Sequence, residues 1–588
     1  MNVKIIHFEQ IKQYLKLLFK TYQTFFKAAF RITLLLVLLT PIQALLPLVT
    51  VQAGQKLIDQ LTAHKSYVYF LALWIVATLL TQLLPVLVTN IQGILTDKLT
   101  GFINISLMEK SKKLMTLELF DNSTYFDDLK LLSEDASWRP VNLIVFGITV
   151  LRDALTLVGM FCLLGKYNWF LALLLFLVLL PQTLVNYRIQ QEAFETMVTR
   201  SKNARKLDYF SSLLLERKDA KEVRIFQMFD PVIQKYRKLF FETQRTVNAV
   251  RKKQLMIASC FLLLTVTVSS VGFWWFIVQV QRQILGVGSL LLYISVIASI
   301  IASMTDIVEM TSLLYDSLLW IKKYDNFLDF KESATDGKLE FNDDFEALTV
   351  KDLSFTYPFS TKEVLHQINF SVKKGERIAI VGENGSGKST LVKLLLKPYP
   401  SSSGTISFDE QKLYDLSAKS YWQKVTVAFQ DFSRFKLSLQ DNVTALEDVS
   451  EQTVKKLLQE VRLPLKAPLK LKTILSREFE DGTELSGGQW QKVALARCLH
   501  RKSKLIFLDE PTAALDAKSE QELYQRFVNL EKDTTLLFVT HRMSAVNLAD
   551  KVLFLKDGRT VAFGPHKDLL ATEPSYRELY ELQKQAYL

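Results

Sequence analysis

Cysteine and histidine are scarce in this sequence of 588 residues. The three cysteines, Cys162, Cys260 and Cys498, lie far apart and never form the CxxC spacing of zinc and redox sites. The six histidines do not cluster either. The sequence therefore predicts neither a disulfide framework nor a metal site built from cysteine and histidine. It also contains no internal repeat and no low-complexity tract.

Acidic residues are outnumbered by basic ones, and the formal net charge is +12. A strongly basic chain can bind nucleic acid, but no recognised nucleic-acid-binding motif accompanies this charge. Much of the excess lies between apolar stretches, where lysine and arginine set membrane topology and meet anionic lipid headgroups. We therefore expect the lipid bilayer as a partner and no nucleic acid.

Long apolar stretches are abundant up to about Leu328. Six of them come close to the roughly 20 residues that cross a bilayer. They cover residues 32–51, 67–88, 145–165, 169–185, 257–280 and 285–301. Residues 1–31 carry six lysines or arginines, whereas the turns after the first, third and fifth spans carry few. The positive-inside rule therefore predicts that both termini and the second half of the chain are cytoplasmic.

The second half contains the sequence VGENGSGKST at residues 381–390, which includes the pattern GxxxxGKS between an apolar run and a leucine-rich run. Its glycines let backbone N–H groups turn inward, and the following helix presents its positive end to phosphates. Lys388 adds a positive charge, and the Ser389 hydroxyl can bind Mg²⁺. This loop predicts a site for ATP or GTP, formed by Gly382, Glu383, Asn384, Gly385, Ser386, Gly387, Lys388, Ser389 and Thr390.

Two further motifs favour a nucleotide site over an ordinary glycine-rich turn. The sequence KLIFLDE, residues 504–510, is an apolar strand that ends in Asp509, suited to hold Mg²⁺ through water, and Glu510, suited to polarise the attacking water. The stretch ELSGGQWQKVALAR, residues 484–497, begins a helix with a second anion-binding nest. This nest comprises Leu485, Ser486, Gly487, Gly488 and Gln489.

The three motifs, in this order, resemble the ATPase domain of ABC transporters. In that family two such domains face each other head to tail, so that LSGGQ of one covers the nucleotide held by the other. The resemblance implies that Tyr357 stacks on adenine, that Gln430 contacts Mg²⁺ and the catalytic water, and that His541 meets the γ-phosphate. It also places Asp516 in a loop at the dimer interface. The implied catalytic residues are Glu510, His541 and Gln430, and the implied Mg²⁺ residues are Ser389, Gln430 and Asp509.

Six spans followed by one ATPase resemble an exporter-type half transporter of the type IV ABC fold. The expected fold class is a membrane α-helical domain with long cytoplasmic extensions plus an α/β P-loop ATPase domain. We expect these domains at residues 1–330 and 348–588, joined by a linker at 331–347. The resemblance implies coupling segments near residues 122–132 and 219–228 that dock beside the loop 430–435. It also implies a homodimer or a heterodimer with a second half transporter.

The substrate is suggested by local resemblance. The sequences LELFDNSTYFDDL and AFQDFSRF, and Trp490 after LSGGQ, look like Gram-positive exporters of modified peptides such as lantibiotics. We therefore expect an ATP hydrolase in a bacterial plasma membrane that moves a peptide out of the cytoplasm. Such a chain without a peptidase domain leaves leader removal to another protein. The same motifs leave open a multidrug or lipid flippase and a siderophore importer.

Two ionisable residues lie inside the third predicted span. Arg152 and Asp153 lie about 20 Å from Lys166 at roughly 1.5 Å per residue, within a hydrocarbon layer of roughly 30 Å. Such residues face protein or a wet cavity, so they are candidates for a substrate path. An intersubunit ion pair without a substrate role remains an equal alternative. Asp306 and Glu309, after the sixth span, are expected near the inner mouth or in solvent.

Overall fold

The computed structural model describes residues 8–118, 120–121, 123–136, 138–194, 202–216, 219–331, 336–358, 360–401, 403–510 and 533–586. The chain divides into two compact units. We call residues 1–110 with 128–330 the helical unit, and residues 111–127 with 331–588 the sheet unit. The chain passes from the helical unit to the sheet unit after residue 330, and residues 111–127 also group with the sheet unit.

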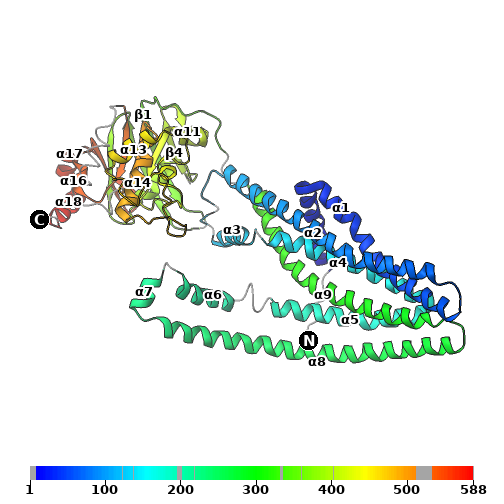
Figure 1. The fold of residues 1–588 in the computed structure, drawn as a ribbon. Coiled ribbons are helices and arrows are strands. Elements are labelled where there is room, and N and C mark those ends of the chain that lie inside the picture. The colour runs from blue at the N-terminus through cyan, green and yellow to red at the C-terminus, as the bar shows by residue number, and fades with distance from the viewer. Residues whose placement is uncertain are drawn as a thin grey trace. The chain divides into compact units, whose positions relative to one another are not determined.

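The helical unit contains long helices that run side by side, together with the shorter helices α3, α6 and α7 (Figure 1). They are α1 (Phe8–Thr62), α2 (Val68–Lys113), α3 (Ser123–Asp135), α4 (Arg139–Tyr167), α5 (Trp169–Phe194), α6 (Lys202–Leu215), α7 (Ala220–Ile225), α8 (Phe229–Gln281) and α9 (Gly288–Asp329). A kink at Ala29 divides α1 before the first predicted span. Helices bond all their interior backbone groups within themselves, which is the arrangement that a lipid environment requires.

Five of the described helices, α1, α2, α4, α8 and α9, are long and apolar enough to cross a membrane. A shorter apolar helix, Trp169–Gln182, is the beginning of α5. Each of the six predicted spans overlaps one of these helices, although the second and the sixth begin shortly before α2 and α9. The prediction that apolar helices fill the first half of the chain is therefore confirmed. The number of six membrane crossings stays a prediction.

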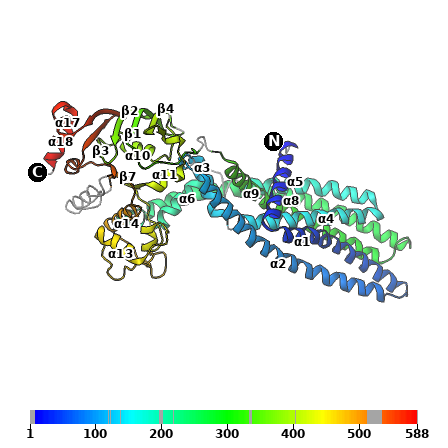
Figure 2. The same cartoon turned by 90° about the horizontal axis from the view of Figure 1, so that it is seen from above.

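Close packing holds the helical unit together. Helix α4 packs against α9 and α1, and α5 packs against α8, as the view from above also shows (Figure 2). At one end, the Asp59 carboxylate of α1 accepts a hydrogen bond of 2.7 Å from the Gly288 N–H, the first residue of α9. A Cβ atom at Gly288 would overlap the backbone of α1. Glycine is therefore required where these two helix ends meet.

The described residues of the sheet unit form two sheets. The described strands of the first are antiparallel in the order β2-β1-β4-β5, with β1 (Ala347–Thr356), β2 (Glu363–Lys373), β4 (Ser403–Phe408) and β5 (Gln411–Lys412). Those of the second follow the order β10-β9-β3-β8-β7-β6, and are parallel from β9 to β6. They are β3 (Arg377–Gly382), β6 (Val425–Ala428), β7 (Leu505–Asp509), β8 (Thr535–Val539), β9 (Lys551–Lys556) and β10 (Arg559–Gly564).

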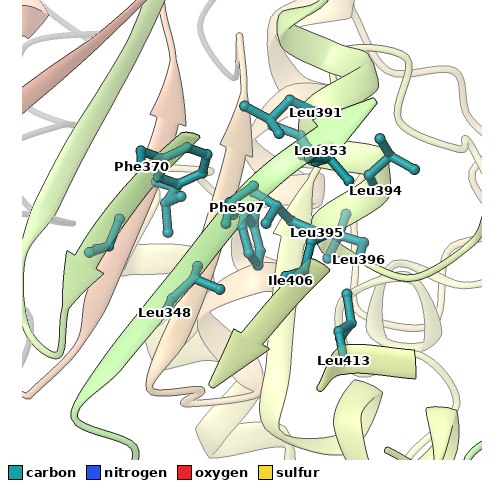
Figure 3. Close-up of a cluster of buried hydrophobic side chains, with 14 of the residues drawn as sticks. Leu348, Leu353, Phe370, Leu391, Leu394, Leu395, Leu396, Ile406, Leu413 and Phe507 are labelled. Atoms are coloured by element: carbon teal, nitrogen blue, oxygen red, sulfur yellow. The ribbon is translucent and has the colours of Figure 1, made fainter. Parts of the chain in front are cut away.

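The main helices of this unit are α10 (Lys388–Leu395), α11 (Ala418–Lys424), α12 (Leu439–Thr444), α13 (Glu451–Glu460), α14 (Gly487–His500), α16 (Met543–Val546), α17 (His566–Thr572) and α18 (Pro574–Ala586). Figure 3 shows leucines of α10, including Leu391 and Leu395, in one cluster with Leu348 and Leu353 of β1 and Phe507 of β7. Each fully buried leucine stabilises the fold by about 2 kcal/mol. The core therefore holds α10 rigidly against both sheets.

Residues 336–346, expected within a linker, pack onto the sheet unit. Phe341 and Phe345 are buried, and both rings contact Phe408 of β4 at centroid distances of 4.8 and 5.0 Å. The Leu339 N–H also donates to the Asp415 carbonyl oxygen at 3.0 Å. The polar composition of this stretch predicts a loop but gives no sign of these two aromatic anchors.

Candidate nucleotide site

Four neighbouring parallel strands end at four of the predicted functional segments. In the order β3-β8-β7-β6, these strands lead into Gly382, His541, Asp509 with Glu510, and Gln430. Ligands of open α/β sheets bind outside the carboxyl ends of the strands. The sheet topology thus assembles residues that are as far apart as Gly382 and His541 in the sequence.

The glycine-rich loop between β3 and α10 has the backbone that a phosphate cradle needs. Gly385 and Gly387 adopt φ angles of +83° and +94°, which side chains strongly disfavour. The Lys388 ammonium group folds back over the loop and donates to the Gly382 and Glu383 carbonyl oxygens at 3.0 and 2.8 Å. Burial lowers the pKa of Lys388 from its ordinary value of 10.5. A phosphate beside Lys388 would stabilise its charged ammonium form and so raise its pKa again.

Ser386, in the middle of this loop, shows that the cradle is suited to a further polar group. Its hydroxyl oxygen is buried and has no hydrogen-bond partner within the part of the chain that the structure describes. Buried hydroxyl groups are nearly always hydrogen-bonded, and an unpaired one costs about 1 to 3 kcal/mol. A bound phosphate oxygen would satisfy it.

Ser389 and Asp509 form the part of the site that fits Mg²⁺. The Ser389 hydroxyl donates to the Asp509 carboxylate at 3.1 Å, which joins the start of α10 to the end of β7. Burial raises the pKa of Asp509, and the hydrogen bond from Ser389 opposes this shift. Both groups offer hard oxygen atoms, and Mg²⁺ is commonly held by one or two carboxylates together with substrate phosphates. The residues present therefore fit this cation.

Glu510 is engaged by two other predicted catalytic residues. Its carboxylate accepts a hydrogen bond of 2.8 Å from the Gln430 side-chain amide, and its other oxygen lies 2.5 Å from His541 Nε2. Burial lowers the pKa of His541 from 6.5, and the nearby Lys388 charge lowers it further, while Glu510 acts in the opposite direction. The structure thus brings Glu510, Gln430 and His541 together.

Tyr357 follows β1 and lies beside α10. Its hydroxyl group is 3.0 Å from the Thr390 hydroxyl, and its ring meets those of Phe355 and Tyr399 edge to face at 4.9 and 5.5 Å. These contacts fix the ring at the edge of the phosphate loop. The sequence motifs predicted the ring but not the side chains that hold it.

The LSGGQ segment begins α14. The Ser486 hydroxyl accepts from the Gln489 N–H at 3.3 Å, and the Gln489 side chain accepts from the Ser486 N–H at 2.9 Å, which forms a capping box. Ser486, Gly487 and Gln489 are exposed, Gly488 is half-buried, and Leu485 is buried. The helix start is therefore accessible to another molecule. Asp516 lies outside the described residues.

The two ionisable residues of the third predicted span form an ion pair within one chain. The Arg152 guanidinium donates to both carboxylate oxygens of Asp153, at 2.7 and 2.9 Å, and lies 3.7 Å from the Asp306 carboxylate of α9. Asp153 is buried, whereas the Asp306 side chain is 47% exposed. The pairing of Asp306 with Arg152 was not apparent from the sequence, because 154 residues separate them.

Comparison with known proteins identifies the family. A family model described as ABC transporter matches residues 365–513. A subtilin transport ATP-binding protein of Bacillus subtilis is 30% identical over 579 residues, which cover 96% of this chain and 93% of that protein. The chain belongs to the ABC transporter family. A nisin transport ATP-binding protein of Lactococcus lactis is 29% identical, covering 95% of this transporter and 95% of that protein.

Two more comparisons concern the wider family. An ATP-dependent lipid A-core flippase of Vibrio parahaemolyticus is 27% identical over 74% of this transporter and 75% of the flippase. The solved structure of a bacterial Atm1-family ABC exporter with ATP bound has the same fold, with a TM-score of 0.75 and 20% identity over 94% of this transporter and 98% of that chain. The predicted exporter fold, with membrane and ATPase domains fused in one chain, is thereby confirmed. This multi-pass membrane protein binds ATP and couples ATP hydrolysis to transport.

Proposed function

We propose that this transporter exports a lantibiotic-like peptide from the cytoplasm of a bacterium, working as a pair of half transporters. The observation that carries the proposal is the similarity to the subtilin and nisin transport proteins along nearly the whole chain, including the membrane half. The ATPase half is shared by transporters of many substrates, so the membrane half is where substrate choice must arise.

A lipid flippase is the second candidate. The lipid A-core flippases also resemble the chain, but over only about three quarters of its length. The difference in coverage favours the peptide. A multidrug exporter or a siderophore importer of the same fold has less support, because no described feature of the membrane half points to either substrate.

In the proposed reaction, the loop from Gly382 to Ser389 holds the phosphates of ATP, and Tyr357 stacks on the adenine. Mg²⁺, held by Ser389 and Asp509 with Gln430 nearby, would neutralise phosphate charge. Glu510 takes the proton of the attacking water, and His541 orients the γ-phosphate. The distances between Glu510, Gln430 and His541 support this assignment.

The site is completed by a second chain, whose LSGGQ segment covers this ATP; that chain is a second copy or a different half transporter. The exposed start of α14 supports such a contact. We place the sheet unit and both termini in the cytoplasm, on the charge asymmetry of the sequence. The exposed apolar Ile225 and Phe226, 75% and 71% accessible, support the docking of residues 219–228 beside the loop 430–435.

The proposal is tested with the purified transporter in liposomes. A nisin precursor peptide that carries its leader is added to vesicles in which the ATPase domains face outward, and ATP-dependent uptake and ATPase stimulation are measured. Peptide uptake that depends on ATP supports the proposal. Stimulation by lipid A core, with no response to the peptide, would instead establish the flippase.

The Glu510→Gln variant is the matched control in this assay. It retains the membrane half, so peptide that merely adsorbs to the vesicles remains in both samples. Only uptake that disappears in Glu510→Gln vesicles counts as transport.

A further inference from the structure

The loop between α13 and the LSGGQ segment carries a dense positive charge. Residues 461–477, which we call the basic loop, contain five basic side chains and no acidic one. The basic residues are all exposed: Arg462, Lys466, Lys470, Lys472 and Arg477. None of the residues assigned above to ATP, to Mg²⁺ or to the dimer contact lies in this loop. The chemistry of the ATPase site therefore does not explain its charge.

Neighbouring side chains do not neutralise the three lysines of the basic loop. Among the described residues, none of these lysines forms an ion pair with a carboxylate. Glu478, the first acidic residue after the loop, pairs with Lys436 at 2.6 Å instead. Clustered charges of one sign create a local potential that concentrates groups of the opposite sign. The basic loop is therefore a surface that attracts anionic groups.

Two successive tight turns hold the backbone of these lysines in place. The Leu469 N–H donates to the Lys466 carbonyl oxygen at 2.8 Å and closes the first turn. The Thr473 N–H donates to the Lys470 carbonyl oxygen at 3.1 Å and closes the second. The Thr473 hydroxyl joins the two turns, because it accepts from the Lys470 N–H at 2.9 Å and donates to the Pro468 carbonyl oxygen at 3.3 Å. A backbone ordered in this way lowers the entropy cost of binding a partner.

The leucines of the basic loop anchor it to the core of the sheet unit. Four of them are buried in the same cluster as Trp490 of α14: Leu463, Leu469, Leu471 and Leu475. The Gln440 N–H of α12 also donates to the Leu471 carbonyl oxygen at 2.9 Å. Because these leucines are buried and the lysines between them are exposed, the basic loop presents charge to the solvent without an apolar face.

The exposed side chains of the basic loop favour one class of anionic partner over two others. Segments that lie on a bilayer insert apolar side chains beside their basic ones. Of the leucines in the basic loop, only Leu465 is exposed, at 39%. Proteins that bind single-stranded nucleic acid stack its bases on aromatic side chains, and the basic loop contains no aromatic residue. The carboxylates of a polypeptide need neither feature, and they pair with the compact charge of a lysine.

We propose that the basic loop docks an acidic segment of a cytoplasmic polypeptide onto the ATPase domain through Lys466, Lys470 and Lys472. The proposal rests on the cytoplasmic placement of the sheet unit in the proposed function, and it does not depend on which substrate crosses the membrane. Exposed charges at an interface act mainly on the association rate and on the choice of partner. The docking is therefore fast and sensitive to salt.

The test measures binding of a fluorescent poly-glutamate peptide to the full-length transporter in nanodiscs of uncharged phosphatidylcholine. The wild-type chain should bind the peptide at low salt and release it as salt is added. The triple variant Lys466→Glu, Lys470→Glu and Lys472→Glu should bind it at least roughly tenfold more weakly. The magnitude follows because each exposed ion pair contributes up to about fivefold in affinity, and the variant removes three of them.

Two further variants separate the position of the charge from its amount and from misfolding. The matched control makes the same change at exposed lysines of β1, β2 and β5, namely Lys351, Lys373 and Lys412, and should bind the peptide like wild type. Glutamine at all three lysines of the basic loop removes the charge without adding repulsion, so it should weaken binding by a smaller factor. Basal ATPase activity within about twofold of wild type shows that each variant is folded.

The outcomes separate this proposal from the proposed function. Equal loss of binding in the basic-loop variant and in the matched control, or no binding by wild type at low salt, would overturn the docking surface. The same titration is made with phosphatidylglycerol vesicles and with a single-stranded oligonucleotide. Tighter binding of either one, lost in the basic-loop variant, would overturn the acidic polypeptide and assign the loop to lipid or to nucleic acid. Peptide export that fails in wild type while poly-glutamate still binds at the basic loop would refute the proposed function alone.

Discussion

Replacing Glu510 by glutamine should nearly abolish ATP hydrolysis and leave ATP binding intact. The Glu510 carboxylate accepts from Gln430 on one oxygen and meets His541 on the other. An amide in its place is nearly isosteric but cannot take a proton from water. One of its two atoms would also present an N–H group toward Gln430 or His541, where the glutamate presents an acceptor.

The magnitude follows from the role of a general base. Loss of such a group slows a reaction by roughly 10²- to 10⁴-fold. That range corresponds to about 3 to 5 kcal/mol of activation free energy. ATP affinity should change little, because the groups proposed to hold the phosphates are in the loop from Gly382 to Ser389, and Ser389 keeps its hydrogen bond to Asp509.

Phosphate release by the purified variant in nanodiscs measures the turnover, and titration with a fluorescent ATP analogue measures binding. Glu410→Gln, which makes the same change in an exposed turn, is the matched control and should hydrolyse ATP like wild type. Turnover of Glu510→Gln near the wild-type rate would remove Glu510 from the role of base. Loss of ATP binding would show instead that the carboxylate holds the loop together.

Three other predictions concern pairing, the membrane half and pH. Lys388→Ala and Gly488→Asp should each inactivate a homodimer. Co-expression of the two variants should restore part of the ATPase activity, because a mixed dimer retains one intact site. No recovery in demonstrated mixed dimers would argue against a composite site. Replacing Arg152 and Asp153 together by leucine should preserve basal ATPase activity and alter substrate-stimulated activity or export; failure to assemble would favour a structural ion pair. Because burial lowers the pKa of His541 below 6.5, its imidazole stays neutral as the pH falls through 6.5. The acid limb of kcat/KM should therefore lie below pH 6.5, and a limb above it that disappears in His541→Gln would contradict this.

The sequence predicts well those features that are encoded locally. The glycine-rich loop needs positive φ angles at Gly385 and Gly387, and only glycine adopts them readily, so the pattern and the backbone correspond directly. The capping box of Ser486 and Gln489 likewise involves residues three apart. The apolar spans are also encoded locally, because bilayer thickness sets the length of an uninterrupted apolar run.

Contacts between distant segments could not be predicted from one sequence. Asp121 and Tyr399, whose side chains form a hydrogen bond, are 278 residues apart, and nothing in the sequence around either residue points to the other. Arg152 and Asp153 were visible as two charges within an apolar span, but Asp306, which also pairs with Arg152, was expected near the inner mouth or in solvent. In both cases the residue type indicates that a partner is needed, and only the packing of the helices, or of the turn that contains Tyr399, decides which partner it is.

Asp509 and Glu510 show how local and distant determinants combine. As adjacent acids at the end of one strand they look interchangeable, yet Asp509 bonds Ser389 while Glu510 meets Gln430 and His541. The backbone conformation at Glu510 explains why the two side chains have different partners. The Glu510 N–H still donates to the Val539 carbonyl oxygen at 3.2 Å, which continues the pairing with β8, but its φ angle of +45° turns the chain out of the strand at that residue. A left-handed glutamate is costly, so the contacts on both carboxylate oxygens must hold it there. One strained residue thus directs one acid toward Ser389 and the next toward Gln430 and His541.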